Sequence, residues 1–182
     1  MIRIVAGKYR HRVLKFPSLE TTRPTKDMVR EALFSSFGEK VHNASILDLF
    51  SGSGSLAIEA ISRGAKKGIC VDKDKQSVNI IKDNIKTLGI DNISIINDDY
   101  KNALSNFDEK FDIIFLDPPY KMDVYQEILD NVMSLNLLNN FGIIVMESDH
   151  ELSLINSYSF KLKTYKYGKR CKSKTNTVGC TS

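Results

Sequence analysis

The sequence predicts an α/β fold in which a doubly wound, mostly parallel sheet follows a small basic β-hairpin. From residue 46 onward, short apolar runs typical of buried strands alternate with segments whose apolar residues recur at helical spacing. Such alternation implies right-handed β-α-β crossovers and a mostly parallel sheet. The 182 residues fit one domain. No apolar run reaches the roughly 20 residues that cross a bilayer.

The first forty residues predict a different unit. Ile2–Val5 and Arg12–Phe16 are expected to be two short strands around Gly7. Thr25 then opens a helix that Gly38 closes. Its apolar positions are Met28, Val29, Ala32, Leu33 and Phe37.

The core that follows is expected to hold five strands and three helices. The strands are Ile46–Phe50, Gly68–Asp72, Ile93–Ile96, Phe111–Leu116 and Gly142–Glu147. The helices run from Gly54 to about Arg63, over Val78–Leu88 and over Val124–Leu135. Gly64 and Gly89 suit the left-handed position that ends a helix.

The end of the chain changes character. Tyr158–Tyr167 predicts a strand, but Lys169–Ser182 has almost no hydrophobic alternation, and only Thr177-Val178 indicates a strand. We therefore expect a tail that is poorly ordered in isolation. The predicted organisation is an N-terminal extension (1–40), a core (41–168) and an atypical basic tail (169–182).

Charge is distributed unevenly along the chain. Residues 1–40 hold nine Lys and Arg against four Asp and Glu, and residues 160–182 hold seven Lys and Arg and no acid. Two basic ends around an acidic middle favour contact with a polyanion through the ends. The alternative is two solvated lysine-rich tails. The three cysteines and three histidines show no metal-ligand spacing. We expect no metal, no membrane contact, a cytoplasmic location and a monomer.

Candidate ligand-binding residues follow the first three core strands, where open α/β sheets bind ligands. Phe50–Gly54 is a glycine loop that brings backbone close to a ligand, although it also matches the dinucleotide fingerprint G-x-G-x-x-A. Asp72, followed by Lys73, ends the second strand, where a carboxylate can accept hydrogen bonds from both hydroxyls of a ribose. A role in a turn or a helix cap is the alternative for Asp72.

After the third strand, Asp99 could accept a hydrogen bond from an adenine amino group, with Tyr100 packing nearby. Asp98 is a near-equal candidate, and a helix-capping aspartate is the alternative for either.

Asp117-Pro118-Pro119-Tyr120, after the fourth strand, is the discriminating segment. The prolines fix the backbone, so that the Asp117 carboxylate and the Pro118 carbonyl can point into the crevice as acceptors. Two acceptors that hold the hydrogens of an exocyclic amine favour a pyramidal nitrogen with its lone pair available. Tyr120 offers a flat face to a flipped-out base. A plain Asp-Pro-Pro turn is the alternative.

This segment resembles the amino-methyltransferase motif of class I methyltransferases. More narrowly, the chain resembles the small bacterial 16S rRNA guanine-N2 methyltransferases of the RsmD type. The likeness rests on Arg3–Gly7, Thr22-Arg23-Pro24-Thr25, Val29–Phe34, Leu47–Gly54 and Asp117–Tyr120, and it covers about residues 1–168. Family members usually add an apolar strand after the Tyr-Gly turn, here Tyr167-Gly168, and Lys169–Ser182 does not resemble it.

The resemblance implies a seven-stranded-type sheet, S-adenosylmethionine as cofactor, and 16S rRNA as partner, in an assembling or assembled small ribosomal subunit. Asp48, Gly52 and Gly54 would line the methionine end, Asp72 would hold the ribose and Asp99 would meet the adenine. Phe50, Lys73 and Tyr100 complete the expected cofactor set. The hairpin, with Arg3, Lys8, Arg10 and Arg12, would dock RNA. Arg23, Thr25 and Arg30 would border the cofactor or target pocket; a phosphate contact for Arg23 and a helix cap for Thr25 are the alternatives.

The resulting hypothesis is direct in-line methyl transfer to the N2 amine of a guanine, without a covalent enzyme intermediate. An adenine-N6 methyltransferase would use the same Asp-Pro-Pro-Tyr motif. A nicotinamide-dependent oxidoreductase would explain the glycine loop but neither that motif nor the basic ends. A non-catalytic RNA-binding or ribosome-assembly module is the third alternative.

Overall fold

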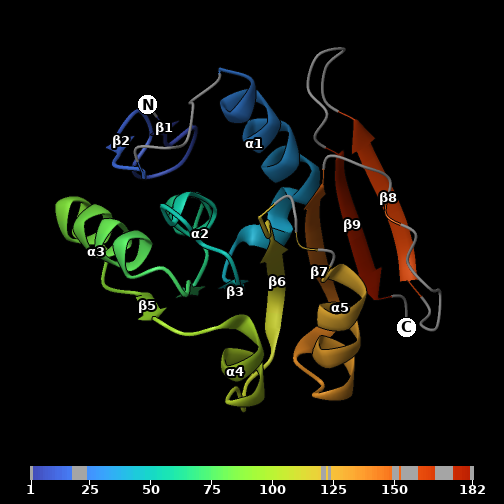
Figure 1. Cartoon of the computed structure of the whole chain (residues 1–182). Coiled ribbons are helices and arrows are strands. Elements are labelled where there is room, and N and C mark those ends of the chain that lie inside the picture. The colour runs from blue at the N-terminus through green and yellow to red at the C-terminus, as the bar shows by residue number, and fades with distance from the viewer. Residues whose placement is uncertain are drawn as a thin grey trace.

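The computed structural model describes residues 2–17, 24–119, 122, 124–148, 152, 160–166 and 174–180 (Figure 1). In 24–26, 160–166 and 174–180 the description is of the backbone. Tyr120, Arg23 and Tyr167-Gly168 lie outside the described residues, as does the side chain of Thr25. None of the described helices is long and apolar enough to span a membrane.

A seven-stranded sheet with the order β5-β4-β3-β6-β7-β9-β8 forms the centre of the molecule. The strands are β3 (Ser45–Asp48), β4 (Lys67–Val71), β5 (Ile93–Ile96), β6 (Phe111–Leu116), β7 (Leu138–Ser148), β8 (Phe160–Lys166) and β9 (Lys174–Cys180). The first five are parallel, while β9 is antiparallel to both β7 and β8. Strand order reverses between β3 and β6, so the predicted doubly wound α/β fold is confirmed.

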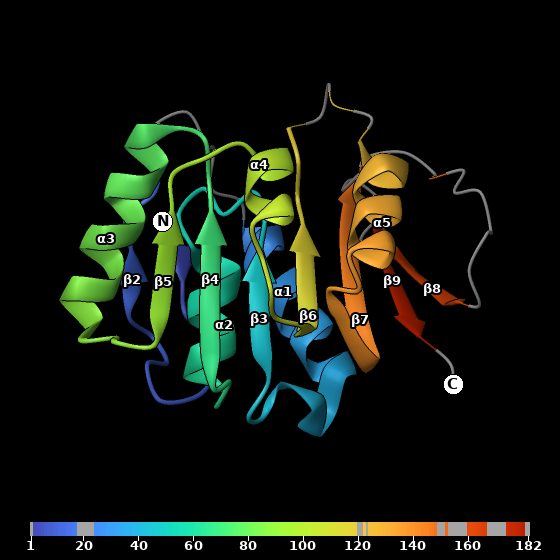
Figure 2. The same ribbon diagram turned by 90° about the horizontal axis from the view of Figure 1, so that it is seen from below.

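Helices cover both faces of this sheet. Figure 2 shows α4 (Tyr100–Ser105) and α5 (Tyr125–Ser134) in front of the strands and α1 (Pro24–Phe37) and α2 (Ser55–Ser62) behind them. The remaining helix, α3 (Lys75–Leu88), lies beside α2 in Figure 1. A 3-10 turn, η1 (Gly38–Val41), leads from α1 to β3. Gly89 ends α3 with φ 66°, as its sequence position predicts.

Alternating side chains of the strands build two cores. In β3, Ile46 belongs to the core under α1 and α2, and Leu47 belongs to the core under α4 and α5. Both side chains are fully buried. The near-continuous apolar runs of these strands follow from this burial on both faces.

The N-terminal hairpin is confirmed, although its strands are shorter than predicted: β1 (Ile2–Arg3) pairs with β2 (Val13–Leu14). The hairpin is held against α2 at Gly7, whose φ is 81°. A Cβ at Gly7 would lie 1.8 Å from the carbonyl oxygen of Ser62. The amide nitrogen of Lys8 donates to that oxygen at 2.7 Å. Only glycine allows this backbone to approach the helix so closely.

The tail forms more regular structure than its sequence indicates, and its strand β9 includes the expected Thr177-Val178. Lys174–Cys180 forms β9, which inserts between β7 and β8 and continues the sheet. The physical reason is backbone pairing on both sides, which needs no apolar alternation. Thr175, Thr177 and Val178 are β-branched and suit a strand.

Two further elements differ from the prediction. The six-residue α4 was not expected, because it is too short to show helical periodicity. Strand β7 begins at Leu138 rather than Gly142, and its pairing with β6 is irregular between Phe111 and Ile113.

Candidate active site

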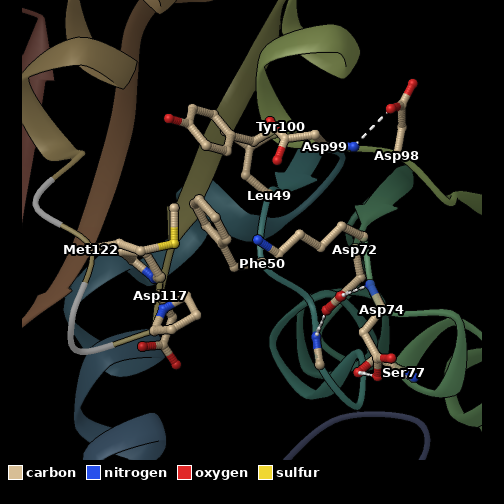
Figure 3. Close-up of a pocket in the computed structure, with 14 residues that line it drawn as sticks. Leu49, Phe50, Asp72, Asp74, Ser77, Asp98, Asp99, Tyr100, Asp117 and Met122 are labelled. Atoms are coloured by element: carbon tan, nitrogen blue, oxygen red, sulfur yellow. Dashed lines mark hydrogen bonds between the residues drawn. The ribbon is translucent and has the colours of Figure 1, made fainter.

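Two cavities lie beyond the carboxyl ends of the parallel strands, on either side of the point where strand order reverses. The larger cavity, of about 350 Å³, is lined by Leu49, Phe50, Gly52, Asp72, Lys73, Asp74, Ser77, Asp98, Asp99, Tyr100, Asp117, Pro118, Pro119 and Met122 (Figure 3). The smaller cavity, of about 130 Å³, is lined by Ile2, Val29, Arg30, Leu33, Asp48, Phe50, Ser51, Gly52, Ser53, Ser55, Leu56, Asp117 and Glu147. Phe50, Gly52 and Asp117 belong to both cavities.

The glycine loop between β3 and α2 forms the wall between the cavities. Gly52 and Gly54 have φ of 53° and 75°, a backbone conformation that favours glycine. The amide of Gly54 donates to the Ser51 carbonyl at 2.7 Å and closes the turn. Gly54 lines neither cavity: a Cβ there would meet Cγ2 of Ile81 at 3.1 Å, so this glycine allows α2 to pack against α3.

Asp72 is placed by the end of β4. Its Oδ2 accepts a hydrogen bond from the Gly52 amide at 2.8 Å, and its Oδ1 accepts one from the Asp74 amide at 2.9 Å. The carboxylate therefore fixes the glycine loop and begins the turn into α3. Each oxygen keeps a second lone pair for a ligand hydroxyl. The exposed Lys73 follows it at the larger cavity.

Asp98 and Asp99 both line the larger cavity, but their hydrogen bonds differ. Asp98 Oδ1 accepts from the Asp99 amide at 2.7 Å and from Asn102 Nδ2 at 3.1 Å. Figure 3 shows its carboxylate turned away from the other labelled residues. Asp99 is the N-cap of α4 and accepts from the Lys101 amide at 3.1 Å. The rings of Phe50 and Tyr100 lie 5.4 Å apart and give this end of the larger cavity an apolar wall.

Asp117 stands where the two cavities meet, directly after β6. Asp117 is exposed and Pro118 is buried. The carbonyl of Pro119 accepts a hydrogen bond from the Met122 amide at 2.8 Å, which holds Met122 beside Pro119. Met122 lines the larger cavity and was not predicted from sequence, where nothing distinguishes it from other apolar residues.

Asp48, at the end of β3, is the buried acid of the smaller cavity. Its side chain has 1% relative exposure, and no residue that the structure describes donates a hydrogen bond to either carboxylate oxygen. Burial, and next the Asp72 carboxylate, raise the pKa of Asp48 to about 7. The amides of Ala57 and Phe50 and the hydroxyl of Ser51 lower it only partly, since none of them is in hydrogen-bonding geometry.

Arg30, on α1, lines the smaller cavity together with Asp48 and is itself buried. Its Nη2 donates to Asp27 Oδ1 at 2.8 Å and to the Arg3 carbonyl, and its Nε lies 3.5 Å from Glu59 Oε2. Glu59 is fully buried in α2 and was missed by sequence reasoning. The sequence feature that could have predicted its role is that Glu59 is the one acid inside the otherwise apolar run Leu56–Ile61.

Glu59 joins the hairpin to the core. It accepts from the amides of Val5 and Ala6 at 2.8 and 3.0 Å, and from Arg63 Nε at 2.8 Å. Glu147, at the end of β7, lines the smaller cavity and was also missed, although it ends a predicted strand.

The predicted RNA-contacting residues of the hairpin lie apart from both cavities. Arg3, Lys8, Arg10 and Arg12 are exposed and line neither cavity. The two cavities thus gather the residues expected at the cofactor and the reacting base, except Gly54 and those that lie outside the described residues. The hairpin touches the smaller cavity through Ile2, but its exposed basic side chains line neither cavity.

Comparisons with known proteins agree with this architecture. A family described as conserved hypothetical protein 95 matches residues 2–175. Ribosomal RNA small subunit methyltransferase D of Haemophilus influenzae is 34% identical over 165 residues, covering 88% of this chain and 86% of that protein. Its counterpart in Escherichia coli K12 is 32% identical over 153 residues, covering 84% and 77%.

Solved structures show the same fold. The yhhF structure of Escherichia coli superimposes with a TM-score of 0.87 and 28% identity over 100% of this chain and 98% of that one. The Thermus thermophilus 16S rRNA N2 G1207 methyltransferase RsmC, solved with AdoMet and guanosine, has a TM-score of 0.73 and 23% identity over 91% of this chain and 45% of that one. The chain belongs to the family described as conserved hypothetical protein 95, together with the ribosomal RNA small subunit methyltransferases D.

Proposed function

We propose that the protein transfers a methyl group from S-adenosylmethionine to the exocyclic N2 amine of a guanine in small-subunit rRNA. The observation that carries this proposal is the position of Asp117 at the junction of the two cavities, in an Asp-Pro-Pro segment at the strand-order reversal. The likeness to ribosomal RNA small subunit methyltransferases D supports the substrate class. We propose a monomeric cytoplasmic enzyme that acts on a ribosomal particle.

The residues present fit the cofactor. A buried carboxylate without a partner, as at Asp48, is costly unless a cation meets it. The methionine end of S-adenosylmethionine carries an ammonium that would supply this cation. At the larger cavity, Asp72 would hold the ribose hydroxyls, with Lys73 beside it, and the apolar wall of Phe50 and Tyr100 suits the adenine.

Asp99 is the better of the two candidates for the adenine amino group. Asp98 Oδ1 is engaged by two donors and the carboxylate points away, whereas Asp99 uses one oxygen to cap α4. The second oxygen of Asp99 could then accept the amino hydrogen.

Asp117 and Pro118 would prepare the nucleophile. When bound, the cofactor supplies an electrophilic methyl group on its sulfonium. The lone pair of an exocyclic amine is delocalised into the base, so that it is a poor nucleophile. The Asp117 carboxylate and the Pro118 carbonyl would each accept one amine hydrogen and stabilise the positive charge that develops on nitrogen. After transfer, the Asp117 carboxylate or water would take the proton. Stacking of the base on Tyr120 remains a prediction, since Tyr120 lies outside the described residues.

Substitution of Asp117 tests the proposal. Asp117→Ala should lower kcat by roughly 100-fold or more, because it removes an acceptor for the reacting amine. Its dissociation constant for S-adenosylhomocysteine should change little, as measured by isothermal titration calorimetry. Asp72→Ala provides the contrast and should mainly weaken cofactor binding. Unchanged turnover in Asp117→Ala would rule out the proposed role.

A further inference from the structure

The smaller cavity is lined by one buried base, Arg30, and by the buried acid Asp48. Resting on the proposed function, we infer that Arg30 binds the α-carboxylate of the methionine end of S-adenosylmethionine, next to the ammonium that Asp48 accepts. Arg30 is the sole Lys or Arg among the described residues that line this cavity. The residue would thereby contribute to cofactor recognition from α1, outside the glycine loop.

The guanidinium of Arg30 is fixed on one side and available on the other. Nη2 is used by Asp27 and by the carbonyl of Arg3, and Nε is directed to Glu59. Among the described residues, both hydrogen bonds of the guanidinium come from Nη2, and Nε, although 3.5 Å from Glu59 Oε2, has no hydrogen bond of normal geometry. An arginine that is held in this way keeps donors for a ligand without reorganising its side chain.

Asp48 explains why the ligand group should be zwitterionic. The Asp48 carboxylate has no partner among the described residues and needs a cation. An α-amino acid carries its ammonium and its carboxylate on one carbon atom, so a site that accepts the ammonium brings the carboxylate within a few ångström of the same place. The same cavity of about 130 Å³ is also lined by the Arg30 guanidinium, and guanidinium and carboxylate form strong charge-assisted hydrogen bonds.

The division of volume between the cavities agrees with this assignment. The larger cavity, of about 350 Å³, has the two ring side chains and the ribose-directed Asp72 and suits a nucleoside. The smaller cavity, of about 130 Å³, is lined by three serines, by the acids Asp48, Asp117 and Glu147 and by one base, and suits a short charged tail. The two cavities meet at Phe50, Gly52 and Asp117, where the methyl donor and the acceptor amine would come together.

The alternative is that Arg30 only ties α1 to the hairpin and to Glu59. A purely structural role would change the affinity for every cofactor analogue by the same factor. Decarboxylated S-adenosylmethionine separates the two cases, because it keeps the adenosine, the sulfonium and the ammonium and lacks only the carboxylate.

The experiment measures dissociation constants of both compounds by calorimetry for the full-length protein and two variants. Arg30→Gln should weaken S-adenosylmethionine roughly 10- to 100-fold, the range expected for hydrogen bonds to a charged group. Its affinity for the decarboxylated compound should stay within about twofold of the wild-type value. The matched control is Arg63→Gln, which also contacts Glu59 but lines neither cavity and should bind both compounds as the wild type does.

Equal losses for the two compounds in Arg30→Gln, or no loss for either, would overturn the inference. If Arg30→Gln does not fold, the wild-type protein still decides, since equal affinity for both compounds would mean that no residue reads the carboxylate. Binding of neither compound by the wild type would overturn the proposed function itself, a result distinct from binding without discrimination.

Discussion

At the scale of single residues, the site is defined by two acids in opposite environments. Asp117 is exposed at the junction of the cavities, whereas Asp48 is buried without a partner among the described residues. Exposure leaves Asp117 accessible to an incoming amine. Burial makes Asp48 a receptor that is complete only when a cationic ligand is bound.

The raised pKa of Asp48 predicts a pH-dependent stability. The folded-state pKa of about 7 lies above the ordinary value of 3.8, so the folded protein binds more protons than the unfolded chain between these values. The free energy of unfolding should therefore fall as pH rises from about 4 to about 7, and by up to about 4 kcal/mol from this group.

Asp48→Asn should remove this dependence. The variant should be more stable than the wild type at pH 8, should converge with it near pH 4, and should bind S-adenosylhomocysteine more weakly. Urea denaturation at a series of pH values measures the first two results. A constant stability difference between the variant and the wild type at all pH values would contradict the assigned protonation.

At the scale of secondary-structure elements, the unexpected feature is how firmly the hairpin is attached to α2. Gly7 packs against the backbone of Ser62, and Glu59 accepts from two hairpin amides. The same Glu59 pairs with Arg30 at the smaller cavity, so one buried acid connects the hairpin with the proposed cofactor site.

Glu59→Gln should therefore destabilise the protein by roughly 3–5 kcal/mol, because an amide cannot satisfy two arginines and two backbone amides. Glu31→Gln is the matched control: Glu31 pairs with Arg63 at 2.7 Å but is 47% exposed, so its loss should cost less than about 1 kcal/mol. Urea denaturation at pH 7 compares the two variants. Equal stabilities would show that Glu59 does not hold the elements together.

The elements also show where sequence reasoning succeeds and where it stops. The strands β3 to β6 and the glycine loop were predicted because burial on two faces and left-handed turns leave strong local patterns. The short α4 and the strand β9 were not, because six residues show no period and β9 depends on backbone pairing with distant strands. For the site, the residues that follow the first four core strands were found, whereas Glu147 at the end of β7 was missed. Glu59 and Met122 were missed because their partners are distant in sequence or because they leave no local pattern.

At the scale of the whole molecule, the basic side chains of the proposed RNA-docking hairpin lie outside both cavities. The hairpin carries exposed Lys8, Arg10 and Arg12, which would contact phosphates without reading sequence. We expect that the hairpin provides affinity for RNA and that methyl transfer takes place at the cavities.

Neutralising the hairpin tests this division. The triple variant Lys8→Gln, Arg10→Gln, Arg12→Gln should bind RNA more weakly and reduce the salt slope of log K by about 0.7–0.9 for each phosphate that the hairpin no longer neutralises. Its affinity for S-adenosylhomocysteine should be unchanged. Replacing Lys40, Lys66 and Lys110, three exposed lysines outside the hairpin that precede β3, β4 and β6, is the control and should leave RNA binding intact. A reversal of these two results would contradict the proposed role of the hairpin in RNA binding.

The most direct measurement of the central claim is the identity of the methylated nucleoside. Small ribosomal subunits from cells that lack the corresponding gene would be incubated with the protein and labelled S-adenosylmethionine, and the RNA would be digested and analysed by mass spectrometry. Label in N2-methylguanosine is the predicted result. Label in N6-methyladenosine would keep the fold and the cofactor but contradict the guanine target, and no label in a protein that binds the cofactor would contradict the proposed activity on this substrate.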